Sequence, residues 1–257
     1  MAEDDPMDQV IDGLLRTAYS SQPAGRTVLG PAENIRQMPR SAFTQHLDRF
    51  YRGDNLILAA SGNVDHDTMV DQAERELGRL PRHRAHPDCP AHYVGGQEAI
   101  EMTGRTQTHI GLALPAAGDG ETDSVTDEVL AKALGGGMSS RLFREIREQR
   151  GLVYSVSAGT FSLEDSGVLF VYGATTPEKT REFVETATDE LAKAADDLTQ
   201  QELDRAKRMV RSQQAQAKQN VSNRRTALED SIRVQGQPET PEDKLAKIEQ
   251  VSLEDCK

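Results

Sequence analysis

A run of arginines behind a glycine loop holds the residue types best suited to chemistry in this sequence. Between Gly135 and Tyr154 they alternate with glutamates and recur at every third position, as Arg141, Arg144, Arg147 and Arg150. By spacing alone, such a stripe is typical of a solvated helix face on which arginines and glutamates form ion pairs. The same cationic flank could instead bind a peptide, so the spacing leaves both interpretations open.

The glycine loop comprises Gly135, Gly136 and Gly137, and Ser139 follows it closely. Glycines in front of a helix can bind phosphate through backbone N–H groups, but neither a GKS or GKT sequence nor GxGxxG is present here. We therefore do not expect a nucleotide site. Glycines also allow close packing or leave backbone groups open to a ligand, so we take these four residues as candidate substrate-binding residues.

The histidines do not form a pattern that predicts a metal site, because neither HxxEH nor HxxxH occurs. His83 and His86 lie near Cys89 and His92, a set that could hold zinc in a loop. The surrounding prolines and the lack of a framing hairpin favour a solvated linker instead. His109 falls in an apolar strand, where we expect it to pack or to form a hydrogen bond. We predict no metal ligand in this chain, and local spacing assembles no Ser–His–Asp triad.

The arginine stripe must lie on a short helix that leads into two strands. Ser139 or Ser140 can cap this helix, and Gly151 supplies a left-handed end after its last turn. The segments Leu152–Ser157 and Val168–Tyr172 are rich in β-branched and aromatic residues and are separated by turn residues, which predicts an antiparallel hairpin. Both alternating sets of the second strand are apolar, which indicates a sheet covered on both faces.

Elsewhere, apolar residues recur mostly at helical spacing. Helices are predicted near residues 6–18, 33–37, 41–51, 65–80, 122–134, 177–191, 199–210, 221–234 and 241–251. Further strands are predicted at Asn55–Val64, Gln97–Thr103 and Thr106–Leu114. Because runs of helices alternate with short groups of strands, we expect an α+β fold with an antiparallel-rich sheet covered by helices. The proline-rich stretch at 81–96 predicts an interdomain linker.

Length, charge and cysteine content bound the class of protein. A chain of 257 residues can form one large domain or two of ordinary size. The net charge of −12 argues against nonspecific binding to nucleic acid or anionic membranes. We expect neither a membrane span nor a signal peptide, since the apolar runs are too short. The separated Cys89 and Cys256 fit a reducing compartment, which slightly favours the cytoplasm and leaves the localisation open.

At the arginine stripe the chain resembles a known family. Ser140-Arg-Leu-Phe-Arg-Glu-Ile-Arg-Glu-Gln-Arg-Gly-Leu-Val-Tyr154-Ser resembles the second-repeat signature of the pitrilysin/insulinase-type zinc metallopeptidases, most closely their mitochondrial-processing-peptidase-like bacterial subfamily. Three earlier segments, Tyr19–Arg26, Phe50–Arg52 and Gly62–Val64, resemble the later part of the family's first repeat. The motifs occur in the family's order, and the likeness covers practically the whole chain.

The resemblance implies two similar α+β repeats that close around an extended peptide. In the first repeat, zinc is bound by the histidines of HxxEH and a downstream glutamate, and the motif glutamate acts as general base. The second repeat contributes an arginine and a tyrosine that hold the substrate and stabilise the developing oxyanion. By motif position these catalytic residues correspond to Arg147 and Tyr154, whose guanidinium and phenol both donate hydrogen bonds.

The departure from the family pattern is that HxxEH is missing, so the resemblance places zinc in an absent N-terminal region. We expect the C-terminal part of a first repeat at 1–80, the linker at 81–96, and a C-terminally truncated second repeat at 97–257. The capping-box sequence Ser252–Asp255, close to the last residue, also predicts truncation. The expected partners are a peptide substrate and the missing repeat or a separate HxxEH-bearing subunit, in a homodimer or heterodimer.

We therefore expect a portion of a zinc metalloendopeptidase for peptides or unfolded segments, inactive as the isolated chain. It would supply substrate binding and oxyanion stabilisation but no zinc ligand. Two alternatives stay open. One is a non-catalytic core or partner subunit of a processing-peptidase-like complex. The other is a stand-alone module that binds peptides through a sheet edge and the arginine flank.

Overall fold

The computed structural model describes residues 5–82, 89–102 and 104–257. Contacts between residues divide the chain into two compact units. The first, called the sheet unit below, comprises Met1–Thr27, Pro90–Gln214 and Pro241–Lys257. The second, called the helical unit, comprises Val28–Cys89 and Ala215–Thr240. These units group residues by contact and not by repeat, so the division into repeats at 1–80 and 97–257 around a linker stays a prediction.

The elements alternate helices with short groups of strands, which confirms the predicted α+β class. The helices are α1 (Pro6–Tyr19), α2 (Ala32–Gln37), α3 (Arg40–Phe50), α4 (His66–Leu77), α5 (Ser124–Gly135), α6 (Thr180–Asp197), α7 (Gln200–Lys218), α8 (Val221–Gln235) and α9 (Pro241–Gln250). The strands are β1 (Thr108–Ala116), β2 (Val153–Ser162) and β3 (Gly167–Thr175). A π-helix, η3, spans Phe143–Gln149, and 3₁₀ turns lie at η1 (Pro23–Gly25), η2 (Gly53–Asn55) and η4 (Pro177–Lys179).

The strands form one antiparallel sheet in the order β1-β3-β2. The predicted hairpin is β2 and β3, paired from Ser162 with Gly167 at the turn to Val153 with Thr175 at the open end. The turn is closed by a hydrogen bond of 2.7 Å from the Leu163 backbone N–H to the Ser166 carbonyl. Strand β3 lies in the middle and is buried on both faces, as its apolar alternation predicts.

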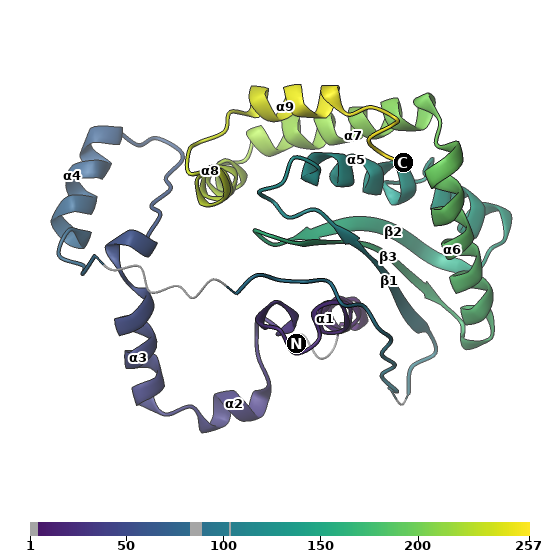
Figure 1. Cartoon of the computed structure of the whole chain (residues 1–257), viewed down its shortest axis with the longest axis horizontal. Coiled ribbons are helices and arrows are strands. Elements are labelled where there is room, and N and C mark those ends of the chain that lie inside the picture. Colours follow the sequence, from purple (N-terminus) through teal and green to yellow (C-terminus); the bar gives the residue numbers. More distant parts are fainter. Residues whose placement is uncertain (1–4, 83–88, 103) are drawn as a thin grey trace. The chain divides into compact units, whose positions relative to one another are not determined.

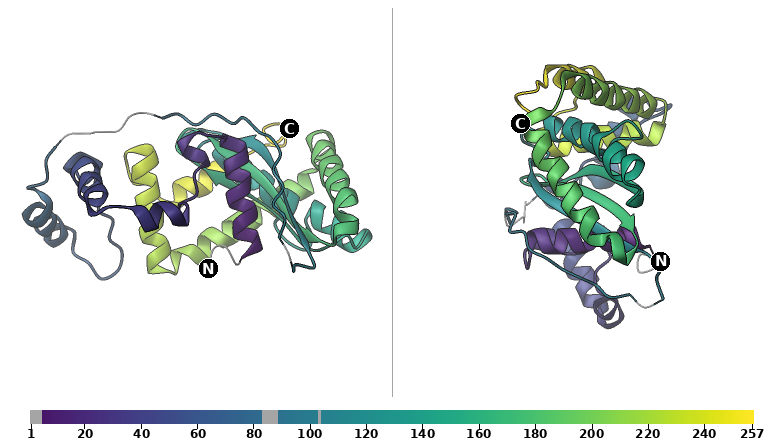
Figure 2. Two further views of the ribbon diagram at one scale, coloured as in Figure 1. Left: turned by 90° about the horizontal axis from the view of Figure 1, so that it is seen from below. Right: turned by 90° about the vertical axis from the view of Figure 1, so that its right-hand side faces the viewer.

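Helices cover both faces of this sheet. Helix α1 lies on one face, and α5 and α6 lie on the other (Figures 1 and 2). Gly111 of β1 permits the contact with α1, since a Cβ atom there would come within 2.7 Å of side-chain carbons of Val10 and Leu14. On the opposite face, side chains of α5, α6, η3, β2 and β3 share one core cluster that includes Leu134, Ile146 and Phe183. The sheet unit thus has apolar layers on both sides of the strands.

A second cluster packs the outer face of α5 against α7 and α9, with Val129, Leu203 and Ile248 each almost fully buried. Helix α1 is fixed at its end by Tyr19, which is fully buried and whose hydroxyl lies 3.1 Å from that of Ser166. Among the described helices, none is long and apolar enough to cross a membrane. These contacts make the sheet unit a packed body that can hold side chains in fixed positions.

Two predicted strands are wrong in the described residues. Asn55 ends the 3₁₀ turn η2 and residues 56–64 are irregular, as are residues 97–102 of the segment predicted at Gln97–Thr103. Thr103 lies outside the described residues. Asn55–Val64 has the apolar composition of a strand, but a strand also needs neighbouring backbone to complete its hydrogen bonds. The described part of the chain supplies no such partner for either segment.

Residues 28–82 of the helical unit bury little of their apolar surface. No described residue between Val28 and Arg82 is buried, although α3 and α4 are amphipathic. Large apolar side chains of this segment are exposed, including Val28, Phe43, Leu47, Tyr51 and Leu58. The apolar faces of α3 and α4 therefore belong to no buried core cluster among the described residues.

Candidate functional site

The arginine stripe lies on a wide helix anchored in the sheet unit. Leu142 and Ile146 are fully buried and join the core cluster beneath the sheet. The backbone N–H of Leu152 donates to the Ile146 carbonyl over 2.9 Å, and Gly151 ends the helix at φ +60°, as predicted. π-helical turns are rare and occur frequently at functional sites. Here the turn holds Phe143–Gln149, and therefore Arg147, next to the start of β2.

The structure brings Arg147 and Tyr154 together on the surface. The Arg147 Cζ atom lies 5.8 Å from the centroid of the Tyr154 ring. The same atom lies 4.8 Å from the centroid of the Phe143 ring. Arg147 is exposed and Tyr154 is 79% exposed, so the guanidinium and the phenol both reach solvent. We call Phe143, Arg147 and Tyr154 the arginine cluster.

The arginines of the stripe have different surroundings. Arg150 pairs with Glu145 over 2.9 Å on the surface, as a salt-bridged stripe predicts. Arg141 is buried, donates to both carboxylate oxygens of Glu202 and also pairs with Asp197. Among the described residues, Arg147 has no carboxylate partner and contacts aromatic rings instead. The stripe thus contains one buried anchor and one exposed, stacked cation.

The Arg141–Glu202 pair fixes the start of the wide helix to α7. Burial raises the pKa of Glu202, but hydrogen bonds from Arg141 and from Thr199 outweigh burial and bring this pKa to about 2. Thr199 and Glu202 also form a capping box, with the Thr199 N–H donating to Glu202 over 3.0 Å. Because Glu202 is ionised and doubly bonded at neutral pH, it is a strong anchor for Arg141.

The predicted serine cap is absent. Ser140 is 98% buried, with 2% of its surface exposed, and its hydroxyl has no hydrogen-bond partner among the described residues. Ser139 is exposed and does not cap the helix. Arg141 and Leu142 are buried as well, so the whole start of this helix is packed against other elements. A local cap pattern carries no information about such burial.

Of the candidate glycines, Gly135 is tightly packed and Gly137 is exposed. A Cβ atom on Gly135 would lie 2.2 Å from the Ala158 backbone nitrogen, so this glycine allows α5 to contact β2. Gly136 is the residue after α5, and Gly137 is exposed with φ +143°. No hydrogen bond or ring contact joins these glycines or Ser139 to the arginine cluster among the described residues. Their assignment as substrate-binding residues stays a prediction.

The described residues do not fit a zinc site, since no group of three or more His, Cys, Asp or Glu side chains comes together among them. His83 and His86 of the possible loop site lie outside the described residues. His109 forms the expected hydrogen bond, with its Nδ1 atom 2.7 Å from the Tyr172 hydroxyl. Its pKa is lowered by burial and by the nearby Arg105. His109 is therefore held as a half-buried structural residue on β1.

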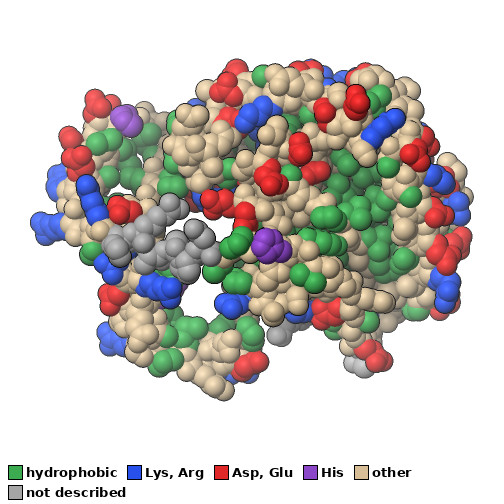
Figure 3. Space-filling model, viewed as in Figure 1, with side chains coloured by type: hydrophobic (Ala, Val, Ile, Leu, Met, Phe, Trp, Pro, Cys, Tyr) green, Lys and Arg blue, Asp and Glu red, His purple; other side chains and the backbone are tan. Residues whose placement is uncertain are grey.

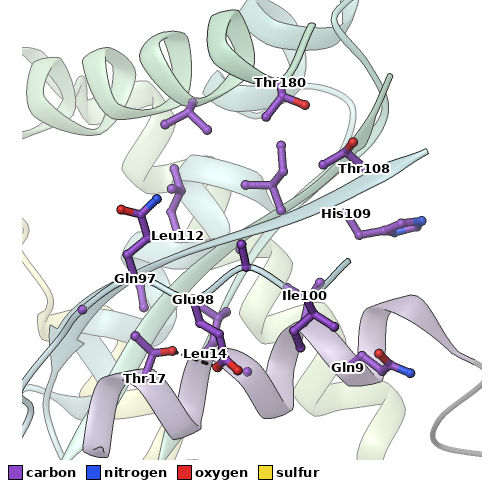
Figure 4. A pocket seen from close by; sticks show the side chains of 18 of the residues that line it. Gln9, Leu14, Thr17, Gln97, Glu98, Ile100, Thr108, His109, Leu112 and Thr180 are labelled. Atoms are coloured by element: carbon purple, nitrogen blue, oxygen red, sulfur yellow. Dashed lines mark hydrogen bonds between the residues drawn. The ribbon is translucent and has the colours of Figure 1, made fainter. Parts of the chain in front are cut away.

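A groove follows the free edge of β1. It has a volume of about 1230 Å³ and is lined by α1, the segment 95–102, β1 and α6. In Figure 4, Leu112 of β1 points toward α6, and Leu14 of α1 lies on the other side of the strand. Hydrophobic side chains gather in a hollow beside α6 in Figure 3. Val184 and Leu191 of α6 belong to this lining.

The groove combines an apolar wall with unpaired strand backbone. Strand β1 pairs with β3 on one side, and its other edge has no strand partner in the part of the chain that the structure describes. One rim is polar, where Arg16 donates to Glu98 over 2.7 Å and Thr17 donates to Glu98 over 3.4 Å. The bond from Arg16 outweighs slight burial and lowers the pKa of Glu98. Such an edge can accept an extended polypeptide by strand addition.

Comparison with known proteins relates this chain to a family. A family model described as "Peptidase M16 inactive domain" matches residues 38–210, which is more than half of the chain. The match includes the arginine cluster, β1–β3 and most of the helices that cover the sheet on the side of α5 and α6.

Curated relatives extend the likeness over the whole sequence. An uncharacterised zinc protease of Mycobacterium bovis is 36% identical over 99% of this chain and 60% of its own length. An uncharacterised zinc protease of Streptomyces coelicolor is 32% identical over 100% of this chain and 58% of its own length. The chain thus spans about 60% of the length of the curated relatives that it matches first.

Solved structures share the fold at lower identity. A chain of complex III2 from Candida albicans superposes with a TM-score of 0.92 at 21% identity, over 99% of this chain and 63% of that one. A protease from Helicobacter pylori gives a TM-score of 0.85 at 18% identity, over 99% of this chain and 63% of that one. From the family match and the relatives above 30% identity, this chain belongs to the M16 peptidases, the pitrilysin and insulinase type, and contains their inactive domain.

Proposed function

We propose that this chain contributes substrate binding and oxyanion stabilisation to a zinc metalloendopeptidase that acts on peptides or unfolded segments. The observation that carries the proposal is the pairing of Arg147 with Tyr154, whose guanidinium carbon and ring centroid are 5.8 Å apart. Both side chains are exposed, and Arg147 has no carboxylate partner among the described residues. Their hydrogen-bond donors are therefore available to a ligand.

The chemistry follows from the groups themselves. When water attacks a peptide carbonyl, negative charge grows on the carbonyl oxygen. A guanidinium stabilises this charge through ionic hydrogen bonds, and a phenol hydroxyl adds one more donor. Arg147 and Tyr154 are near enough to donate to one such oxygen or to neighbouring carbonyls of an extended peptide. Their proposed effect is on the transition state more than on substrate affinity.

The proposal places the zinc ligands on polypeptide outside this sequence, because HxxEH is absent from it. The relatives called zinc proteases are longer than the part matched by this chain. The exposed apolar faces of α3 and α4 support a partner polypeptide that covers them. This partner is either the N-terminal repeat of a longer chain or a separate HxxEH-bearing subunit.

The test is steady-state cleavage of a quenched peptide by the chain assembled with an HxxEH-bearing polypeptide. We expect Arg147→Ala and Tyr154→Phe each to lower kcat about a hundredfold, the usual effect of removing one oxyanion donor. Arg144→Ala is the matched control, since Arg144 is an exposed arginine of the same helix outside the arginine cluster. Wild-type kcat in both cluster variants would remove the assigned roles and favour the non-catalytic subunit.

The groove at β1 favours a second candidate function, peptide binding without chemistry. Its apolar lining and unpaired strand edge suit an extended segment that adds to the sheet. We expect Val184→Asp, on the α6 wall, to weaken binding of a labelled unfolded polypeptide if this edge is the site. Arg147→Ala would leave that binding unchanged. The first proposal instead predicts that Arg147→Ala lowers turnover and that Val184→Asp does not.

A further inference from the structure

The Phe143 ring packs against the guanidinium of Arg147, the side chain to which the proposed function assigns oxyanion stabilisation. Its ring centroid lies 4.8 Å from the Arg147 Cζ atom, which is within the usual range of a cation–π contact. Phe143 itself is half-buried and packs against the core cluster of the sheet unit. The ring is thus fixed from below by the core, while the guanidinium above it faces solvent.

The wide helix brings these side chains onto one side. Hydrogen bonds in a π-helix join residues five positions apart, so side chains four positions apart, as in Phe143 and Arg147, lie on nearly the same flank. Tyr154 comes from β2, and its ring centroid lies 5.8 Å from the Arg147 Cζ atom. Arg147 is therefore in contact with one ring on its own helix and another on the following strand.

Stacking holds a guanidinium without using its hydrogen-bond donors. The five N–H groups lie in the plane of the guanidinium, whereas a cation–π contact uses its face. An ion pair uses the donors themselves, as in Arg150, whose Nε donates to Glu145 over 2.9 Å. An arginine held by rings keeps its N–H groups for a ligand, and an arginine held by a carboxylate does not.

From this geometry we propose that Phe143 is a positioning residue for Arg147, holding its guanidinium beside Tyr154 with the N–H donors free. This inference rests on the proposed role of Arg147 and adds a residue outside the candidate site residues of the sequence. The aromatic face is the required feature, and apolar bulk is not enough. Phe143→Tyr therefore keeps the effect, and Phe143→Leu loses it.

The experiment measures Arg147 directly in the folded chain by NMR. Protons on the Arg147 Cδ are shifted upfield by the ring, and the assignment is confirmed by their loss in Arg147→Lys. In the wild type we expect these protons upfield of those of Arg144, which contacts no ring in the described structure. We expect Phe143→Leu to reduce the shift and Phe143→Tyr to retain it. Phe161→Leu, a half-buried ring on β2, is the matched control and should leave the shift unchanged.

A second readout is the cleavage of the quenched peptide by the chain assembled with the HxxEH-bearing polypeptide. The cation–π contact, about 1 kcal/mol, favours the positioned guanidinium about fivefold, so Phe143→Leu should lower kcat by up to about fivefold and leave KM unchanged. Phe143→Tyr should have the kcat of the wild type. Arg147 protons at the same position as those of Arg144 in the wild type, or an unchanged shift in Phe143→Leu, would overturn the positioning role. Unchanged kcat in Arg147→Ala would instead remove the catalytic role of Arg147, while the NMR shift still decides whether Phe143 positions it.

Discussion

At the scale of single residues, one arginine stripe serves two structural purposes. Arg141 is buried and bonded to Glu202, so it ties the wide helix to α7. Arg147, six residues further along, is exposed and stacked on aromatic rings. The first keeps the helix in place through a desolvated ion pair, and the second keeps its donors available. Identical side chains therefore differ in role because their neighbours differ.

The pKa of Glu202 makes the stability of the fold sensitive to acid. Burial raises this pKa, but the bonds from Arg141 and Thr199 bring it to about 2, against 4.5 for an unperturbed glutamate. Because the folded-state pKa is depressed, the ionised group stabilises the fold fully above pH 4.5, and this contribution is lost as the pH falls toward 2. The shift corresponds to roughly 3 kcal/mol of the free energy of unfolding at neutral pH.

Urea titrations from about pH 5 to about pH 3 measure this contribution. We expect the wild type to lose stability more steeply over that interval than Glu202→Gln, which has no carboxylate to protonate at this site. Glu249→Gln is the control, since Glu249 forms an exposed pair with Arg211. Its slope should follow that of the wild type. Equal slopes for the wild type and Glu202→Gln would show that Glu202 does not carry the acid dependence.

At the scale of elements, the position of the arginine cluster depends on how closely α5 and β2 approach. Gly135 is the last residue of α5, and a Cβ atom there would lie 2.2 Å from the Ala158 backbone nitrogen. Strand β2 carries Tyr154 at its start, and α5 leads into the helix that carries Arg147. A change at this contact would therefore move both members of the cluster relative to the core.

We expect Gly135→Ala to lower the free energy of unfolding by about 2–3 kcal/mol, because the added methyl group overpacks the contact between α5 and β2. Gly13→Ala makes the same chemical change inside α1, where the nearest atom to a Cβ is 3.7 Å away. That variant should raise the free energy of unfolding by about 0.5–1 kcal/mol through helix propensity. Chemical denaturation of both variants checks the pair, and an unaltered stability in Gly135→Ala would contradict the close packing.

At the scale of the whole molecule, the two units differ in how much core they contain. The sheet unit has clusters on both faces of β3, with residues such as Val168 and Val171 almost fully buried. The helical unit exposes apolar side chains along α3 and α4, and none of its described residues from 28 to 82 is buried. Burial of apolar surface is the main stabilising term in folding, so we expect the units to differ in local stability.

Hydrogen exchange followed by mass spectrometry checks this difference. In the monomeric chain we expect amides of residues 57–61 to exchange without protection, since the described structure gives them no backbone acceptor. Amides of β3, bonded on both sides, should be strongly protected. Addition of the HxxEH-bearing polypeptide should slow exchange at 57–61 if it supplies a neighbouring strand. Protection of 57–61 equal to that of β3 in the monomer would contradict the uncovered surface.

The sequence by itself determined the features that depend on near neighbours. Helical spacing predicted α1 and the helices after β3, and turn residues predicted the hairpin of β2 and β3. Gly151 marked the end of the wide helix, and the signature around Arg147 identified the family. Each of these patterns lies within a few helical turns or a single hairpin, so neighbouring residues alone are enough to predict it.

Only the tertiary structure decided which side chains meet. It buried the Ser140 hydroxyl with no hydrogen-bond partner in the described part of the chain, paired Arg141 with Glu202, and placed Phe143 against Arg147. It also left Asn55–Val64 irregular despite an apolar composition typical of a strand. Strand pairing and buried ion pairs require partners that are distant in sequence, and a local pattern cannot specify whether those partners are within reach.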